Sequence, residues 1–454
     1  LGRLWLLNNP ASGLAAKMDY YIAPEEPETD FLKITKPEEI RICDPAAGSG
    51  HMLTYAFDLL YAIYEEEGYD ATEIPALILT HNLTGVEIDD RAGALAAFAL
   101  AMKAAARLGR RRFLRMETKP DICVLQNVAF TDAEMQDVAA VVGKDLFTDE
   151  LRETLGQFEQ AKNFGSLIVP KLRDPAETLR VVEARDFGSD LLLKDVQARV
   201  VAVLRMAEAL APKYHVVVAN PPYAGAKGLN STVKDFLNTE YKDVKADLYS
   251  AFMQRIIHSL PENGFIGLMT PFNWLFLDTF SKLRKSIHAN SEVQCLVRPE
   301  YHSFFESAYV PICAFTIRKT KKPYRSGTYI DLDQFYGSSE QAARTREAIQ
   351  DSNCTWRFSA SAEDFNKIPG QPIIYWLSDE MLEAFSKFQP LSDFASPKIG
   401  MRTGDNDRFL RRWHEVAQVD FRHPNLAREN LRWVPYNKGG DFRRWYGNLE
   451  YVVN

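Results

Sequence analysis

The sequence predicts an α/β fold built on a mostly parallel sheet. Short runs of β-branched residues alternate with helical patterns through the first two thirds of the chain, which is typical of strand–helix–strand units. The chain has 454 residues, 46% of them hydrophobic and 25% charged, which suits a large core with at least one further module. This composition excludes a disordered, collagenous or disulfide-stapled protein.

The elements can be placed in order along the chain. The first unit is a strand ending at Asp44, a glycine turn, and a helix whose apolar residues recur at helical spacing up to Gly68. The later strands are expected at 83–88, near 122–125, at 216–219, at 265–270, and as a terminal pair at 293–297 and 312–317. The later helices are expected at 90–107, 247–260 and 277–289.

Changes of pattern divide the chain into four parts. Residues 131–212 are rich in Ala, Glu, Leu and Arg without a clear strand signal, which predicts a helical insertion into a core formed by 1–130 and 213–322. Isolated strands, turns and single helices predict a connector over 323–395. Residues 396–454 are rich in Arg, Trp, Tyr and Gly, a composition suited to phosphates and base faces.

Charge is distributed unevenly along the chain. The net charge of −7 argues against a protein that coats nucleic acid or membrane nonspecifically. Residues 398–454 carry 11 Lys and Arg against 7 Asp and Glu, whereas the residues before them carry 43 against 54. The last part of the chain is therefore its basic part.

The sequence lacks the signatures of metal-bound, secreted and membrane proteins. Its five cysteines show no CxxC spacing, so we expect neither a metal site nor disulfides, and a reducing cytoplasm fits best. The longest run of small apolar residues, 92–102, is about half of the ~20 residues needed to cross a bilayer. The chain begins at Leu1 without a methionine and stops within a patterned stretch, so we expect it to be a piece of a longer protein.

A glycine motif, DPAAGSG at 44–50, lies where the first strand meets its helix. Glycines let the backbone turn sharply and approach a ligand closely, and parallel sheets bind ligands at the carboxyl ends of their strands. The carboxylate of Asp44 suits a cationic amine at that edge. Taken alone, a tight turn without a ligand explains the motif equally well.

Glu87 ends the next expected strand, within GVEID at 85–89. A carboxylate at this position can accept both hydrogen bonds of a ribose diol, although a solvated carboxylate at a strand end is the simpler alternative. The two motifs together favour a nucleoside-bearing cofactor, with NAD and S-adenosylmethionine both open.

A third motif, Asn220-Pro221-Pro222-Tyr223, follows the buried strand 216–219. Pro222 lacks an N–H and stiffens the turn, so the Pro221 carbonyl and the Asn220 side-chain oxygen remain as acceptors for the two hydrogens of an exocyclic amine. When these two acceptors bind the hydrogens of the amine, electron density on its nitrogen rises, and the nitrogen can then attack the methyl group of a sulfonium. Tyr223 offers a ring on which a flipped base can stack, for roughly 1–3 kcal/mol. This chemistry selects S-adenosylmethionine.

Together the three motifs resemble those of the amino-methylating, S-adenosylmethionine-dependent DNA methyltransferases of the adenine-specific branch. Residues 44–50 match the DPACGSG motif of that family, with Ala47 in place of cysteine. Asp247-Leu248-Tyr249 with Phe252 resembles a later motif. The resemblance implies a Rossmann-like methyltransferase fold with a helical insertion and the start of a C-terminal target-recognition domain.

The resemblance also assigns roles to individual residues. It implies cofactor contacts from Asp44, Pro45, Ala46, Ala47, Gly48, Gly50 and Glu87, with Asn127 as the candidate that reads the cofactor's adenine. It implies catalysis by Asn220, Pro221, Pro222 and Tyr223, with Phe305 contacting the target base opposite Tyr223. The candidates for DNA contacts are Lys227, Arg402, Lys438, Arg443 and Arg444.

A closer resemblance extends along nearly the whole chain. LGRLWLLNNP, IRICDPAAGSGHMLTYAFDLLY, GVEIDDRAGALAAFAL and KGGDFRRWYGN are similar to segments of the PglX family, the methyltransferases of bacteriophage-exclusion (BREX) systems. This resemblance implies N6 methylation of adenine in duplex DNA, host marking in phage defence, and other BREX proteins as partners. GMRTGDNDRF at 400–409 resembles the bridge to the recognition domain of related single-chain enzymes, so 396–454 would open that domain.

Two other functions remain open. A methyltransferase acting on RNA or on protein glutamine can share the NPPY motif, although the Arg- and Trp-rich tail favours DNA. The second alternative is a DNA-recognition subunit that needs partner proteins before it methylates.

Overall fold

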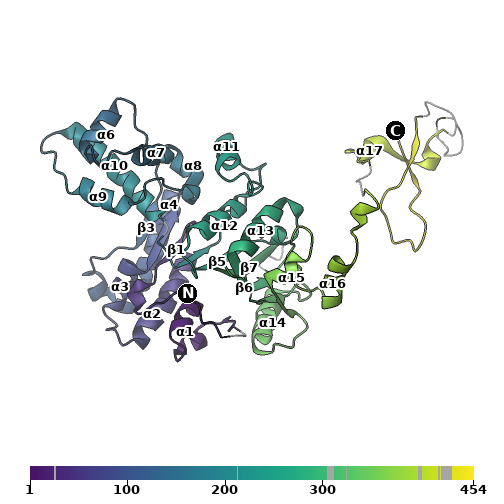
Figure 1. Cartoon of the computed structure of the whole chain (residues 1–454), viewed down its shortest axis with the longest axis horizontal. Helices are drawn as coiled ribbons and strands as arrows, with labels where there is room; N and C mark the ends of the chain where they lie inside the picture. The colour runs from purple at the N-terminus through teal and green to yellow at the C-terminus, as the bar shows by residue number, and fades with distance from the viewer. Residues whose placement is uncertain are drawn as a thin grey trace. The chain divides into compact units, whose positions relative to one another are not determined.

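A nine-stranded sheet forms the centre of the first of two structural units (Figure 1). The computed structural model describes residues 1–24, 27–211, 213–303, 311–323, 325–396, 401–417, 420 and 432–454. The first unit spans Leu1–Ser386 and the second Lys387–Asn454. The strands of the sheet are β1 (Ile42–Asp44), β2 (Leu83–Glu87), β3 (Asp121–Val124), β4 (Val216–Ala219), β5 (Phe265–Pro271), β6 (Ser291–Arg298), β7 (Ile312–Lys319), β8 (Gly327–Asp331) and β9 (Arg357–Ala360).

The strand order is β3-β2-β1-β4-β5-β7-β6-β8-β9. The first five strands of this order run parallel, and β7 runs antiparallel to both β5 and β6. The predicted α/β class with a mostly parallel sheet is confirmed, as is the terminal strand pair β6–β7. Because the chain reverses direction across the sheet at β1, the carboxyl ends of β1 and β4 lie side by side where a ligand can bind.

Helices cover both faces of the sheet because its strands are apolar on both sides. Ile42, Val216 and Phe265 share one buried cluster with α2 (His51–Glu66) and α3 (Ile74–His81). Their neighbours Cys43, Val217 and Ile266 belong to a second cluster with α10 (Leu191–Ala209) and α12 (Leu248–Ser259). Successive side chains of a strand point to opposite faces, so each face has its own core.

The helices expected at 90–107 and 277–289 are present, and this part also contains helices that the sequence did not predict. Helix α4 (Asp90–Leu108) begins at Asp89, whose side chain accepts the N–H groups of Arg91 and Ala92. The other helices are α1 (Gly2–Asn8), α5 (Arg110–Phe113), α11 (Ser231–Glu240) and α13 (Ser281–Asn290).

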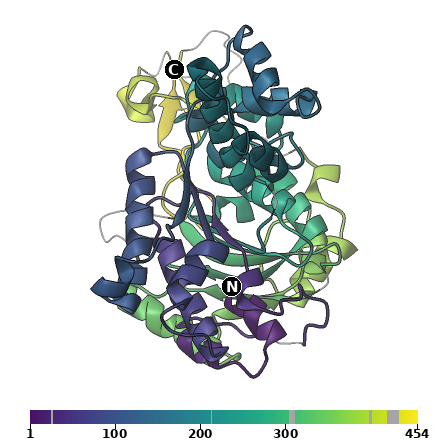
Figure 2. The same ribbon diagram turned by 90° about the vertical axis from the view of Figure 1, so that its left-hand side faces the viewer.

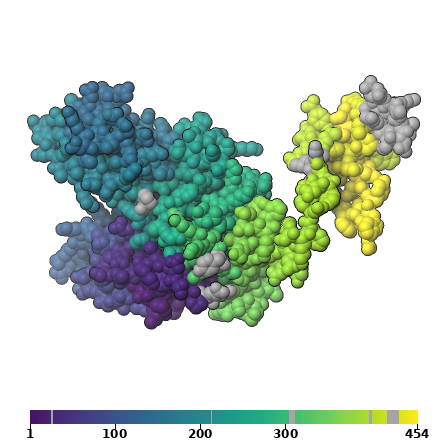
Figure 3. Space-filling model, in the orientation of Figure 1, coloured from purple at the N-terminus to yellow at the C-terminus, as the bar shows by residue number. Residues whose placement is uncertain are grey.

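Every regular element described between residues 131 and 211 is helical. These are α6 (Glu134–Val142), α7 (Asp149–Gln157), α8 (Ala161–Phe164), α9 (Pro175–Glu183) and α10, with short 3-10 turns at Phe158–Gln160 and Gly165–Leu167. Thr148, Asp174 and Asp190 cap α7, α9 and α10 through their side chains. The helices form a lobe at one end of the first unit, away from α1 and α2 (Figures 2 and 3).

The segment expected as a connector, 323–395, contributes to the sheet. Strand β8 pairs with β6 and β9 pairs with β8, and α14 (Ser338–Gln350), α15 (Ala362–Asn366) and α16 (Asp379–Lys387) accompany them. Strands of four or five residues give little local periodicity, so their pairing with a distant strand leaves no clear mark on the sequence.

The second unit contains a small antiparallel sheet. Its order is β10 (Leu410–Arg412), β12 (Tyr451–Val453) and β11 (Val434–Tyr436), and a short helix α17 (Asn406–Phe409) precedes β10. The Arg- and Trp-rich segment 441–446 lies between β11 and β12.

Candidate active site

The glycine motif forms the turn between β1 and α2. Gly48 has φ +53° and Gly50 has φ +83°, both in the left-handed region that favours glycine. Gly50 also packs against α4, because a Cβ added there would lie 3.1 Å from the Cα and Cβ atoms of Ala96. The turn thus requires glycine at both positions, and it brings the backbone of the motif to the carboxyl edge of the sheet.

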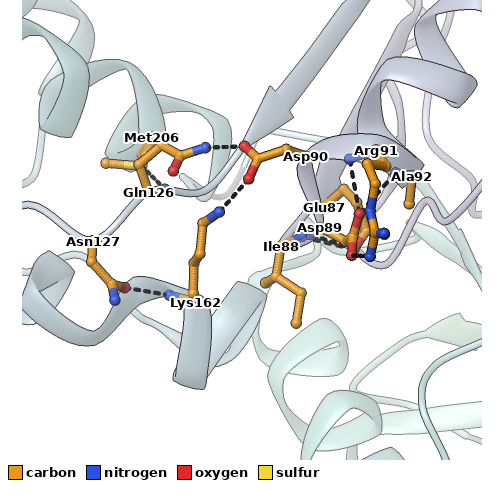
Figure 4. Close-up of polar contacts among 10 residues, drawn as sticks. All are labelled: Glu87, Ile88, Asp89, Asp90, Arg91, Ala92, Gln126, Asn127, Lys162 and Met206. Atoms are coloured by element: carbon orange, nitrogen blue, oxygen red, sulfur yellow. Dashed lines mark hydrogen bonds and ion pairs between the residues drawn. The ribbon is translucent and has the colours of Figure 1, made fainter.

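Glu87 connects this turn to the end of β2. One carboxylate oxygen, Oε2, accepts the N–H of Gly48 at 2.7 Å. The other, Oε1, accepts the N–H groups of Ile88 at 2.8 Å and Asp89 at 3.0 Å (Figure 4). The carboxylate therefore links the loop after β1 to the loop after β2 through hydrogen bonds.

Asp44 is a buried carboxyl group, 2% exposed. Its Oδ1 accepts the N–H of Ala46 at 3.0 Å. Burial raises the pKa of Asp44 to about 7; the charge of Glu87 adds to this effect, and the Ala46 N–H opposes it. Within the described part of the chain, no cation contributes to this pKa, so a bound cationic group would stabilise the carboxylate.

The Asn-Pro-Pro-Tyr segment follows β4 at the same edge. Asn220 and Pro222 are exposed, Pro221 is buried, and the Tyr223 side chain is 41% exposed. The Tyr223 hydroxyl lies within hydrogen-bonding distance of Asn220 Oδ1 and, at 3.0 Å, of the Met269 carbonyl. It has one proton for these two acceptors. Burial raises the pKa of Tyr223 to about 12, so the hydroxyl keeps that proton at neutral pH.

The N-terminus of α12 fixes the chain immediately after Tyr223. Asp247 caps α12, and its Oδ1 also accepts the N–H of Ala224 at 3.1 Å. The Leu248 N–H donates to the Ala224 carbonyl at 3.1 Å. These bonds hold the motif from its C-terminal side, while β4 holds it from its N-terminal side.

A cavity of about 260 Å³ joins the motifs, and we call it the motif cavity. Its lining includes Pro45 and Ala46 from the glycine motif, Glu87 from β2, and Asn220 and Pro222 from the segment after β4. Ile88, Leu248, Phe252, Asn163, Phe164, Gly165 and Ser166 complete the lining. Residues from all three sequence motifs therefore meet around one space.

The helical lobe supplies one wall of the motif cavity, through Asn163, Phe164, Gly165 and Ser166. The Ser166 hydroxyl donates to the Pro45 carbonyl at 2.6 Å, which ties the lobe directly to the glycine motif. Sequence reasoning missed this wall. The break of the helical pattern at Gly165, where φ is +57°, is the available signal, and it does not say which surface the turn contacts.

Polar contacts beside the cavity attach α8 to the core (Figure 4). Asp90, at the start of α4, accepts hydrogen bonds from Lys162 Nζ and Gln126 Nε2, both at 2.5 Å. The side-chain oxygen of Asn127 accepts the backbone N–H of Lys162 at 2.8 Å. Asn127 therefore anchors α8 and does not line the motif cavity, although the sequence suggested it for the cofactor's adenine.

The other predicted site residues occupy different places. Phe305 lies outside the described residues. Lys227 is exposed in the loop after Tyr223. In the second unit, Arg402, Arg443 and Arg444 are exposed, and Lys438 Nζ lies 4.9 Å from the ring centre of Tyr451.

The described residues contain neither a metal-binding cluster nor a membrane-spanning helix. Among the residues that the structure describes, no group of three or more His, Cys, Asp or Glu side chains could hold a metal ion. In the same ranges, no helix combines the length and the apolar character needed to cross a membrane.

Comparisons with known proteins find related sequences along the whole chain. The family described as Eco57I restriction-modification methylase matches residues 81–305. The adenine-specific methyltransferase BrxX of Escherichia coli O9:H4 (strain HS) is 34% identical over 488 residues, which cover 100% of this chain and 40% of BrxX. The adenine-specific methyltransferase PglX of Lacticaseibacillus casei (strain Zhang) is 34% identical over 455 residues, which cover 96% of this chain and 37% of PglX.

The chain spans about two fifths of the length of these curated relatives. Among solved structures, a nuclease-deletion mutant of the Type ISP restriction-modification enzyme LlaGI, in complex with a DNA substrate mimic, aligns with a TM-score of 0.46 and 14% identity. That alignment covers 78% of this chain and 26% of the LlaGI chain. Residues 81–305 therefore match the Eco57I restriction-modification methylase family, and the chain is similar along its length to two proteins named adenine-specific methyltransferases.

Proposed function

We propose that the protein transfers a methyl group from S-adenosylmethionine to the N6 amine of adenine in duplex DNA. The observation that carries this proposal is the motif cavity, because it brings the cofactor-type residues Pro45, Ala46 and Glu87 together with Asn220 and Pro222. A methyl donor held by the first set would meet an amine held by the second.

The residues around the cavity fit S-adenosylmethionine. Asp44 does not line the cavity itself but precedes the lining residue Pro45, and it is a buried carboxyl without a cationic partner among the described residues, which suits the ammonium group of an amino acid. Glu87 lines the cavity at the end of β2, and its Oε2, which accepts only the Gly48 N–H, has one lone pair left for a ribose hydroxyl. When bound, the cofactor would supply an electrophilic methyl group on a sulfonium.

The segment after β4 would hold and activate the target amine. Asn220 Oδ1 and the Pro221 carbonyl accept its two N–H groups and raise the electron density on the nitrogen. Asn220 Oδ1 lies within hydrogen-bonding distance of the Tyr223 hydroxyl here, so Tyr223 orients this acceptor before a base arrives. The Met269 carbonyl offers the hydroxyl a second acceptor when the amine binds.

Duplex DNA is the favoured substrate class, and a role in BREX-type phage defence is the favoured biological setting. Relatives that match along the chain are named adenine-specific methyltransferases, and the second unit presents exposed Arg443 and Arg444 beside exposed aromatic rings. We propose that the protein marks host DNA in the cytoplasm together with other BREX proteins. The alternatives are a recognition subunit that needs partners, and a methyltransferase for RNA or protein glutamine.

Transfer of a tritiated methyl group tests the proposal. The chain is incubated with labelled S-adenosylmethionine and, separately, with unmethylated genomic DNA, RNA or cell protein, with Asn220→Ala as the matched control. We expect label on N6 of adenine in DNA, and none with the variant. Label on RNA or glutamine would reject DNA as the substrate, and label that appears only after addition of partner proteins would support the recognition-subunit alternative.

A further inference from the structure

A second, larger cavity lies at the seam between the helical lobe and the core of the first unit. Its volume is about 440 Å³, within the usual range for small-molecule sites. It is lined from α7, from the segment after α8, and from α11 and α12, and we call it the seam cavity. It shares Phe164 with the motif cavity, and no motif of the proposed reaction lies in it.

Arg255 of α12 is the buried charged group of this cavity, 9% exposed. Its Nη2 donates to the carbonyls of Leu210 at 2.7 Å and Ile168 at 3.3 Å. Its Nε is buried without a hydrogen-bond partner among the described residues. Burial lowers the pKa of the guanidinium, and no described carboxylate contributes to that pKa. A buried cation without an anion is unfavourable, so an anionic ligand would stabilise it.

The other walls of the seam cavity indicate which groups, besides an anion, a ligand would carry. Phe164 and Phe236 are stacked, with ring centres 4.1 Å apart, and both line the cavity. Gln157 donates through Nε2 to the Val169 carbonyl at 2.9 Å, while its Oε1 is buried without a partner in the described part of the chain. The cavity thus combines an aromatic wall with the buried Arg255 guanidinium and the Gln157 amide, and Arg173, Glu240 and His258 also line it.

We propose that the seam cavity is a binding site for a small aromatic anion, with a carboxylate or phosphate on Arg255 and a planar ring beside Phe164 and Phe236. The anionic group pairs with the Arg255 guanidinium, and a polar group on the ring lies beside Gln157. This site is separate from the proposed cofactor site and stands whether or not the methyl transfer occurs.

A purely structural role for Arg255 is the competing explanation. The two carbonyls that Nη2 caps belong to the lobe segment after α8 and to the C-terminus of α10, so the side chain also joins the lobe to α12. That role accounts for the hydrogen bonds of Nη2. It does not account for the unpaired Nε or for the cavity beside the side chain. It predicts that anions do not bind there.

Calorimetric titration of the whole chain separates the two explanations. The probes are benzoate, phenyl phosphate and uncharged benzyl alcohol, each titrated with S-adenosylhomocysteine present at saturation to fill the motif cavity. We expect benzoate or phenyl phosphate to bind with a Kd of about 1 mM or below, and benzyl alcohol at least about tenfold more weakly. The tighter of the two anions tells whether a carboxylate or a phosphate is preferred.

Two variants and one control assign the binding to the seam cavity. Arg255→Gln should remove the preference for anions, Phe236→Ala should weaken all ring-bearing probes by about tenfold, and Arg180→Gln, an exposed change on α9, should alter nothing. If Arg255→Gln fails to fold, the wild-type probe series and Phe236→Ala decide. Equal binding of benzyl alcohol and the anions, no anion binding up to about 10 mM, or unchanged anion binding in Phe236→Ala would overturn the proposal.

Discussion

Glu87 and Asn220 both line the motif cavity, and we expect them to have different roles. Glu87 accepts three backbone N–H groups, so its carboxylate shapes the glycine loop as well as facing the cavity. Asn220 is exposed, and its amide oxygen, which lies within hydrogen-bonding distance of the Tyr223 hydroxyl, is the proposed acceptor for an incoming amine. Replacement of the two residues should therefore affect different measurements.

Asn220→Ala should abolish methyl transfer while the affinity for S-adenosylhomocysteine stays within about threefold, under ~1 kcal/mol. Glu87→Ala should weaken that affinity by more than about tenfold, because it removes both a ligand acceptor and the partner of the Gly48 N–H. Calorimetry measures the affinities, and label transfer measures activity. Loss of cofactor binding in Asn220→Ala with retention in Glu87→Ala would reverse the assigned roles.

Substitutions at Tyr223 test whether its ring or its hydroxyl contributes to methyl transfer. Tyr223→Phe frees Asn220 Oδ1 and keeps the stacking face, so it should retain most activity. Tyr223→Ala should lose roughly 1–3 kcal/mol of transition-state stabilisation, measured as kcat/KM on DNA. An equal loss in both variants would show that the hydroxyl, through its contact with Asn220, is the group that matters.

If Asp44 meets the cationic group of the cofactor, we expect cofactor binding to depend on pH. Because burial raises its pKa to about 7, the free protein holds a proton there at lower pH. An ammonium group binds the carboxylate form, so the proton must leave on binding. The affinity for S-adenosylhomocysteine should fall about tenfold per pH unit below pH 7 and level off above it. Asp44→Asn should bind weakly with a flat profile, and a flat wild-type profile would show that Asp44 does not meet the cationic group.

At the scale of elements, the turn after α8 joins a lobe to the glycine motif by one hydrogen bond. Ser166→Ala removes the bond to the Pro45 carbonyl. We expect the free energy of unfolding to drop by about 1 kcal/mol and the affinity for S-adenosylhomocysteine to drop by about three- to tenfold. Thermal unfolding and calorimetry measure the two effects, with the exposed Ser338→Ala on α14 as control. An unchanged cofactor affinity would limit Ser166 to a role in stability.

The elements also show what the sequence could predict. Strands β1, β2 and β4 were predictable because each is a short run that ends at a sequence motif, and a parallel sheet then places their ends together. The contact between Ser166 and Pro45 spans 121 residues, and no local pattern encodes such a pairing. For the same reason the sequence pattern over 323–395 predicts a connector, whereas β8 and β9 of this segment pair in the sheet.

Asn127 illustrates the limit for single residues. An amide in a loop after β3 suits the recognition of an adenine, but the same amide also suits a backbone N–H, and here it accepts the N–H of Lys162. Composition and order along the chain cannot distinguish a partner in the protein from a partner in a ligand. The turn at Gly48 and Gly50 could be predicted with less ambiguity, because the backbone conformation of the turn itself favours glycine at both positions.

At the scale of the whole molecule, negative charge dominates before residue 398 and positive charge after it. In the second unit, Phe442, Trp445 and Tyr446 are 80% or more exposed, and the Arg444 guanidinium lies 5.7 Å from the ring centre of Trp445. Arginine beside exposed rings is suited to phosphates and bases. This part of the chain is therefore where we expect salt-dependent contacts with DNA.

Replacement of both Arg443 and Arg444 by Gln should weaken binding to duplex DNA and lower the slope of log K against log salt by about 1–2, since each lost phosphate contact removes about 0.9. Replacement of both Arg110 and Arg111, an exposed pair on α5, should leave the slope unchanged. Fluorescence anisotropy across a salt series measures both. Equal slopes in all three proteins would place the DNA contacts elsewhere.

Phe164 borders both the motif cavity and the seam cavity. Two ligands that contact the same ring can be coupled, and this coupling is reciprocal. If an aromatic anion changes the dissociation constant of S-adenosylhomocysteine by some factor, then S-adenosylhomocysteine changes that of the anion by the same factor. We expect the two ligands to strengthen each other's binding. An occupant that orders the Phe164 ring spares the other occupant the entropic cost of ordering it. One shared side chain would thus let the level of a small metabolite set how readily the protein takes up its methyl donor.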